Sequence, residues 1–331
     1  MNEITKRRFL IVDVVLILLL VLSLLFFRKI IDELDRRAIS EDELNRRHGE
    51  SIWYQGKEYP LKRHLSTVLL IGTDNFVEDE EEFEYEMFYN MEMADFLIVL
   101  AFDHEAKTVT PFQICRDTMC QVPWLTVNGM VGGTRLEQIS LAHSYGSGGK
   151  DSCINTRNAV ENLLYGMLID SYFSFTMDTV PLLNDLVGGV TVKLEDDIPA
   201  LGPEYTAGAS VTLRGEEALH FVRYRDLTQL DGNLNRMAHH RVYLDAFLGQ
   251  SRRALEKDSD LAVKAFDKAE RFLCTDLTVN NVSKIVDELC EYEVLPVVTP
   301  RGEYVAGELF AEYYVDDASL WDCVYSTFCR K

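Results

Sequence analysis

The first half of the chain contains three apolar runs with the pattern of buried β-strands. They read TVLLIGTD at residues 67–74, DFLIVLAFD at 95–103 and KTVTPFQICRD at 107–117. Short apolar runs bounded by polar residues are typical of strands in the interior of a sheet. Because only DHEAK joins the second run to the third, we expect these two strands to form an antiparallel hairpin.

Three polar residues mark the ends of these expected strands. Asp74 follows the first strand, Asp95 begins the second and Arg116 lies at the end of the third. If the first strand also pairs antiparallel with the second, the three side chains meet at one edge of the sheet. The pattern therefore predicts a polar cluster there.

Helical and strand-like segments alternate further along the chain. Residues 155–168 and 216–222 and the leucine-marked stretch after residue 233 have helical spacing, SYFSFT and VTVKL resemble strands, and VPLLNDLVGG reads as a helix ended by glycines. On the helix after residue 233, Arg236, His239 and His240 share one face. We therefore predict an α/β fold, a three-layer arrangement in which a mixed sheet is flanked by helices.

The N-terminal apolar run, residues 9–27, is long enough to cross a bilayer as a helix. Charged residues follow it directly, which favours an uncleaved single-pass anchor with a cytoplasmic N-terminus and an extracytoplasmic C-terminal domain at the cell membrane. We therefore expect a cytoplasmic segment (residues 1–8), the transmembrane helix (9–27) and a stalk and entry segment (28–65). A catalytic domain (66–250) and an extension packed on it (251–331) follow.

Charge narrows the choice of partners. The formal net charge of −21 argues against nucleic acid, whose binding needs an extended basic surface. Within this acidic chain, residues 221–241 concentrate four arginines and two histidines. Guanidinium groups bind phosphate oxygens in pairs, so the segment predicts a bound di- or polyphosphate, unless it is simply a solvated basic face.

The seven cysteines do not have the spacing of a zinc site. Two pairings are conceivable in an oxidising compartment, Cys323 with Cys329 and Cys274 with Cys290. Small buried thiols in a reducing environment are an equal alternative.

An ordered set of motifs resembles the LytR-CpsA-Psr family of bacterial cell-envelope proteins. The motifs are VLLIGTDN, ADFLIVLAFD, ICRDTM, SLAHSYGSGG, LNDLVGGVTV, LRGEEALHFVRYR and LNRMAHHR, between about residues 66 and 250. The resemblance implies a membrane-anchored phosphotransferase that moves a glycopolymer from a polyprenyl-pyrophosphate lipid to a sugar hydroxyl, typically of peptidoglycan. It also implies an apolar pocket for the lipid between sheet and helices.

The resemblance also implies roles for particular residues. Asp74 and Asp95 match the aspartates that hold Mg²⁺, a metal that prefers oxygen ligands. The expected catalytic residues are Asp95, Arg116, Asp117 and Asp231, with Asp95 or Asp231 as the base. The expected pyrophosphate-binding residues are Arg116, Arg223, Arg225 and Arg236. His240 is expected to join them because it shares a helix face with Arg236, not because the resemblance implies it.

Several positions depart from the family pattern. Gln138 stands where a lysine is frequent, Asn233 where an aspartate is usual, and His239 with His240 where an Arg-Gln pair is usual. Asp231, two residues from Asn233, is the expected substitute for the missing aspartate. The departures keep a second hypothesis open, in which the domain binds lipid-linked polymer or a wall component as a scaffold or regulator with little catalysis.

Overall fold

The computed structural model describes residues 51–74, 89–226, 228–308 and 310–330. The expected cytoplasmic segment, the transmembrane helix and the stalk up to residue 50 lie outside these ranges. Within them, no helix combines the length and the apolar character that a membrane span requires. All of the described residues belong to one compact unit.

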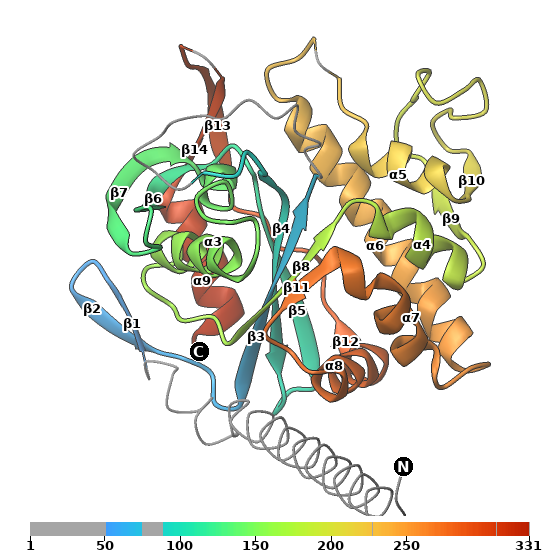
Figure 1. Cartoon of the computed structure of the whole chain (residues 1–331), viewed down its shortest axis with the longest axis horizontal. Helices are drawn as coiled ribbons and strands as arrows, with labels where there is room; N and C mark the ends of the chain where they lie inside the picture. The colour runs from blue at the N-terminus through green and yellow to red at the C-terminus, as the bar shows by residue number, and fades with distance from the viewer. Residues whose placement is uncertain (1–50, 75–88, 227, 309, 331) are drawn as a thin grey trace, which may run out of the picture. The chain divides into compact units, whose positions relative to one another are not determined.

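A six-stranded mixed sheet forms the centre of the unit, in the order β11-β8-β3-β4-β5-β12 (Figure 1). Strand β4 pairs antiparallel with both β3 and β5, as the sequence predicted, whereas β8 pairs parallel with β3 and β12 parallel with β5. The strands are β3 (Leu65–Thr73), β4 (Ala94–Asp103), β5 (Thr108–Ile114), β8 (Ser171–Thr176), β11 (Leu273–Thr275) and β12 (Glu293–Val294).

Strand β4 is apolar on both sides because helices or hairpins cover both faces of the sheet. Leu97 and Val99 contribute to one hydrophobic core, and Ile98 and Phe102 contribute to the other. Successive side chains of a strand point to opposite faces, so a central strand between two layers needs a continuous apolar run. The expected mixed sheet flanked by helices is confirmed.

The first layer packs on the left face of the sheet in Figure 1. Its helices and strands are β1 (Ser51–Tyr54), β2 (Lys57–Pro60), β6 (Met119–Leu125), β7 (Val131–Gln138), η1 (Ile139–Ala142), α3 (Lys150–Leu163) and α9 (Asp317–Phe328). Helix α3 begins and ends five residues earlier than predicted. It ends there because Tyr165 and Gly166 adopt positive φ angles of 58° and 80°, which an α-helix excludes.

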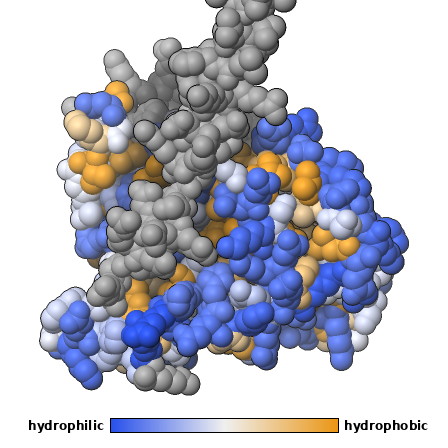
Figure 2. All heavy atoms as spheres, turned by 90° about the horizontal axis from the view of Figure 1, so that it is seen from below, coloured by the Kyte–Doolittle hydropathy of each residue, from blue (hydrophilic) through white to orange (hydrophobic). Residues whose placement is uncertain are grey.

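The second layer consists mainly of helices on the opposite face (Figure 1). It comprises α4 (Thr179–Leu186), β9 (Val190–Lys193), β10 (Ser210–Leu213), α5 (Glu216–Arg223), α6 (Gly232–Leu255), α7 (Leu261–Ala269), η2 (Glu270–Phe272) and α8 (Val279–Glu291). Viewed from below, the described surface is mostly hydrophilic, with apolar residues in separate patches (Figure 2).

The C-terminal residues are integral to the sheet. Strands β11 and β12 are the two edge strands of the sheet. The hairpin of β13 (Gly302–Ala306) and β14 (Ala311–Val315) packs beside the end of β5. The expected domain boundary at residue 250 falls inside α6. The segment after residue 250 therefore completes the same α/β unit.

Candidate functional site

The three polar residues at the strand ends meet as the sequence predicted, and a β-bulge orients one of them. Phe96 pairs with Gly72 and Ala94 with Thr73, so Asp95 is the extra residue between two register positions. A bulge bends its strand and changes the direction of the side chain. The bulge therefore places Asp95 beside Arg116, which follows β5.

Asp95 accepts hydrogen bonds from two arginines that come from different elements. Both Nη1 of Arg116 and Nη2 of Arg236 on α6 donate to its Oδ1, the latter at 3.1 Å. All three side chains are largely buried. Burial opposes the charge of this carboxylate, but the two guanidinium groups outweigh burial and lower the pKa of Asp95 below its ordinary value. Asp95 therefore stays ionised.

A second carboxylate and a more exposed arginine extend this cluster. Nη2 of Arg223, at the end of α5, donates to Oδ2 of Asp74 at 2.9 Å. Burial and the negative charge of Asp95 raise the pKa of Asp74 despite Arg223 and Arg236. Two carboxylates close enough to disfavour each other's charge favour an additional cation between them.

The buried Asp117 carboxylate is the second centre of the site. It accepts hydrogen bonds from Gln138 Nε2 at 3.2 Å, from Asn233 Nδ2, and from the hydroxyl of Tyr304 on β13 at 2.9 Å. Its Oδ1 also lies 3.4 Å from Nε of Arg116.

Two of the departures from the family pattern, Gln138 and Asn233, thus meet at Asp117. Relative to the expected family pattern, Gln138 replaces a cation and Asn233 replaces an anion. The two changes together leave the sum of the side-chain charges around Asp117 unchanged. Asn233 also accepts a hydrogen bond from Nη1 of Arg225 at 3.3 Å. Arg225 is thereby linked to the same cluster.

The structure does not bring all predicted site residues together. Asp231 is exposed at the start of α6, where its side chain does not form a capping hydrogen bond. His240 is buried, and its Nε2 donates to the carbonyl of Val222 at 2.8 Å. Arg241 donates to Gln113 at 2.9 Å. Of the four arginines of the segment, Arg223 contacts Asp74 and Arg236 contacts Asp95.

His240 is uncharged at physiological pH because it is buried. Burial, with a contribution from the charge of Arg236, lowers its pKa from 6.5 to about 3. A histidine that is neutral at physiological pH adds no positive charge to an anion site. This residue therefore does not fit the expected role in pyrophosphate binding, and the sequence could not indicate its full burial.

We expect His240 to make stability dependent on pH. Because its folded pKa lies below its unfolded value, its contribution to stability is present above pH 6.5 and is lost as the pH falls. The free energy of unfolding should decrease by about 2 kcal/mol from this residue between pH 7 and pH 5. Urea denaturation of wild type and His240→Gln measures it, and equal pH profiles would contradict the assignment.

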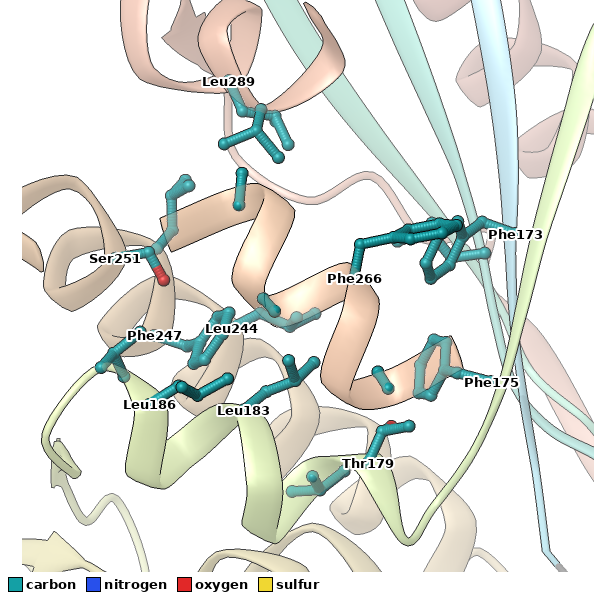
Figure 3. Close-up of a pocket in the computed structure, with 18 of the residues that line it drawn as sticks. Phe173, Phe175, Thr179, Leu183, Leu186, Leu244, Phe247, Ser251, Phe266 and Leu289 are labelled. Atoms are coloured by element: carbon teal, nitrogen blue, oxygen red, sulfur yellow. The ribbon is translucent and has the colours of Figure 1, made fainter. Parts of the chain in front are cut away.

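An apolar pocket lies between the sheet and the helices of the second layer. Its cavity volume is about 340 Å³. Figure 3 shows side chains from β8, α4, α6, α7 and α8 that converge on the same space, among them Phe175, Leu183, Phe247, Phe266 and Leu289. Nearly all lining side chains are aliphatic or aromatic, so the pocket suits a hydrocarbon.

The polar cluster lies at one end of this pocket. Phe96 and Val222 line the cavity, and each is the chain neighbour of a residue in the cluster, Asp95 and Arg223. On α6, the pocket residue His240 lies one turn after Arg236. A molecule with an apolar tail and an anionic head would contact both regions.

The carboxylates of the cluster are the candidate ligands for a metal ion. Among the residues that the structure describes, no three His, Cys, Asp or Glu side chains form a metal-binding group. Asp74 and Asp95 are the two carboxylates beside Arg223 and Arg236. Two carboxylates fit Mg²⁺, which usually retains several waters and takes further ligands from phosphate.

The cysteines contribute nothing to this site as ligands. All seven are free, so neither Cys323 with Cys329 nor Cys274 with Cys290 is joined. Cys115, Cys120, Cys153 and Cys329 are buried. The structure therefore has the small buried thiols that the sequence left as one of two alternatives.

Fold and site together define an α/β protein that presents an arginine and carboxylate cluster beside an apolar pocket of about 340 Å³. The chain belongs to the LytR_cpsA_psr family, whose family model matches residues 31–314. The resemblance found in the motifs is thereby confirmed.

Two curated relatives carry transferase names. TagV of Bacillus subtilis, a polyisoprenyl-teichoic acid–peptidoglycan teichoic acid transferase, is 25% identical over 239 residues, which are 70% of this chain and 55% of TagV. TagU of Halalkalibacterium halodurans, named for the same activity, is 30% identical over 158 residues, 48% of this chain and 47% of TagU. The chain thus spans about half the length of these relatives.

Solved structures share the fold. The crystal structure of B. subtilis TagV has a TM-score of 0.59 and 22% identity, with 80% of this chain and 96% of TagV covered. A structure of TagT bound to LIIa-WTA has a TM-score of 0.60 and 19% identity, with 84% of this chain and 95% of that chain covered.

Sequence reasoning missed two components of the site. Tyr304 lies 187 positions after Asp117 in the chain, and nothing in its local sequence distinguishes it from other hairpin tyrosines. Helices α7 and α8 supply part of the pocket wall from the segment expected to be an extension. The apolar spacing of these two helices was the signal that could have indicated their role, because it gave each helix an apolar face to which the sequence pattern assigned no packing partner.

Proposed function

We propose that this protein transfers a glycopolymer from a polyprenyl-pyrophosphate carrier to a sugar hydroxyl of peptidoglycan. One observation carries the proposal, the apolar pocket whose end meets the cluster of Arg116, Arg223 and Arg236. The prenyl chain would occupy the pocket and the pyrophosphate would replace part of the contacts between arginines and aspartates. The names of the relatives TagV and TagU support the same class of substrate.

The reaction would be a single displacement at phosphorus. The acceptor hydroxyl oxygen forms a bond to the phosphorus that bears the sugar, and the bond from that phosphorus to the bridging oxygen breaks. Polyprenyl phosphate leaves with the bridging oxygen, and the hydroxyl proton passes to a base. Such a reaction depends on positioning and charge neutralisation more than on covalent catalysis.

The described side chains supply charge neutralisation more clearly than they supply a base. Arg116 and Arg236 are buried and fixed by Asp95, so they would bind the developing charge without large reorganisation. Arg223 is half exposed and would close on the outer phosphate. Asp95, whose pKa is lowered, is poorly suited to accept a proton. Asp231, the other expected base, is exposed at the start of α6 and is not part of the cluster, so the described side chains assign no base.

Asp74 and Asp95 are the residues that would hold Mg²⁺ in this proposal. When bound, the ion would supply charge neutralisation for the pyrophosphate. The pocket would lie outside the cytoplasm, with residues 9–27 as the anchor in the cell membrane and peptidoglycan as the acceptor.

A binding or regulatory role is the second candidate. The departures at Asn233 and His239 motivate it, because neither supplies the charge of the family pattern. The contacts of Asn233 with Asp117 and Arg225 weaken this alternative, since the polar cluster is connected without the missing aspartate.

Transfer from a synthetic lipid-linked wall polymer to peptidoglycan fragments, assayed with the purified full-length chain in detergent, tests the proposal. Product is expected with MgCl₂, and EDTA should abolish it until magnesium is restored. Tight binding of the lipid substrate without any product would refute the transferase and support the binding role. Product formation that EDTA does not affect would contradict the magnesium assignment alone.

A further inference from the structure

The β13–β14 hairpin contacts the polar site from the segment after residue 250. The backbone amide of Tyr313 donates to the carbonyl of Asp117 at 2.9 Å, and Thr118 forms a bridge with Tyr313. Gln138 Nε2 also donates to the carbonyl of Ala311 at 2.7 Å. The hairpin is therefore fixed to the backbone that carries Arg116 and Asp117.

Tyr304 is the hairpin side chain that enters the site. Its hydroxyl lies 2.9 Å from Oδ2 of Asp117 and 3.2 Å from Sγ of Cys115. Burial, together with Cys115 and Asp117, raises the pKa of Tyr304, so the hydroxyl stays protonated and donates to the carboxylate. The pKa of Cys115 is raised to about 11, mainly by burial, so its thiol is protonated and can donate to the tyrosine oxygen.

Asp117 connects this tyrosine to the arginine of the site. Its Oδ1 lies 3.4 Å from Nε of Arg116, and that Nε has no hydrogen-bond partner. The Nη groups of Arg116 contact Asp95, Met93 and Ser140. The guanidinium thus lies between two carboxylates, hydrogen-bonded to Asp95 and at ion-pair distance from Asp117.

From these contacts we infer that Tyr304 is a positioning residue for the proposed transfer reaction. By donating to Oδ2, it fixes the Asp117 carboxylate so that Oδ1 faces Arg116, which orients the guanidinium toward the pyrophosphate. The inference rests on the proposed function and adds a residue from outside the region of the family motifs. Small errors in the orientation of a charged donor reduce rates strongly, because the transition state demands defined geometry.

Tyr313 offers a matched control on the neighbouring strand. It is buried, its ring lies 4.9 Å from that of Tyr304, and its hydroxyl donates to the carbonyl of Pro300 at 3.3 Å. A Tyr313→Phe change therefore removes one hydroxyl from the same hairpin without touching Asp117. A loss of hairpin stability alone would affect both variants similarly.

The test compares Tyr304→Phe and Tyr313→Phe with the wild type in two assays. One measures kcat for transfer from the lipid-linked polymer, and the other measures the affinity for geranylgeranyl pyrophosphate by calorimetry. We expect Tyr304→Phe to lower kcat about tenfold and the affinity about threefold. Tyr313→Phe should stay within about twofold of the wild type in both assays.

The outcomes separate this inference from the proposed function. If the two variants behave alike in both assays, Tyr304 has no positioning role. If the wild type binds geranylgeranyl pyrophosphate but never forms product, the transferase proposal fails, and a selective loss of affinity in Tyr304→Phe still supports the inference. A wild type that binds no geranylgeranyl pyrophosphate overturns both.

Discussion

Replacing Arg116 with alanine is expected to lower kcat/KM for transfer by about 100- to 1,000-fold, the range for removal of one fixed donor from a charged transition state. Arg116 is one of two arginines that bind Asp95, and its Nε lies 3.4 Å from the Asp117 carboxylate. Its loss removes a guanidinium that is already oriented before substrate binds. The affinity for inorganic pyrophosphate should fall as well, which calorimetry measures.

Two further variants make this prediction specific. Arg116→Lys keeps the charge but lacks the planar pair of donors, so we expect it to recover only about tenfold of the loss. Arg214→Ala removes an exposed arginine near the start of α5 and should have no effect beyond about twofold. If Arg116→Ala remained folded with the pyrophosphate affinity of the wild type, the assignment of the anion site would be wrong.

Filling the apolar pocket should have the second large effect. Ala265 on α7 lines the cavity, and Ala265→Phe would place a ring in the space proposed for the prenyl chain. Excluding one five-carbon isoprene unit from the pocket would cost up to about 4 kcal/mol of binding free energy. We therefore expect at least about tenfold weaker binding of geranylgeranyl pyrophosphate, again by calorimetry.

The same helix provides the control for this variant. Val263→Phe adds a ring of equal size at an exposed position, where Val263 is 39% accessible, and should leave binding unchanged. Inorganic pyrophosphate should bind Ala265→Phe as it binds the wild type, because the polar cluster is intact. Undiminished binding of the prenyl ligand by a folded Ala265→Phe protein would mean that the chain lies elsewhere.

The fold could be predicted where hydrophobic pattern and pairing agree. The continuous apolar runs and the short turn before Lys107 identified the antiparallel pairing of β4 and β5, and that order brought Asp74, Asp95 and Arg116 to one edge. Strands β11 and β12 have only three and two residues, too few for a periodic pattern. Their place at the sheet edges depends on tertiary contacts.

The site was predictable only as far as charge and motif indicated it. Charge and motif identified Arg116, Arg223, Arg225 and Arg236 as site residues. The bulge at Asp95, however, arises from a shift in strand register that no single sequence reveals. His240 was assigned to the anion because it shares a helix face with Arg236. On that face Arg236 contacts Asp95 in the polar cluster, whereas His240, one turn later, is bound to the carbonyl of Val222 beside the apolar pocket.

The closure of the sheet by its last strands has a consequence for how the chain is made. Until residues 273–294 have been synthesised, β8 and β5 lack their neighbours and both edges of the sheet present unpaired backbone groups. A nascent or truncated chain would thus be open to pairing with other strands. In the folded protein the edge strands β11 and β12 have only three and two residues, and such short edges offer little template for pairing with another chain.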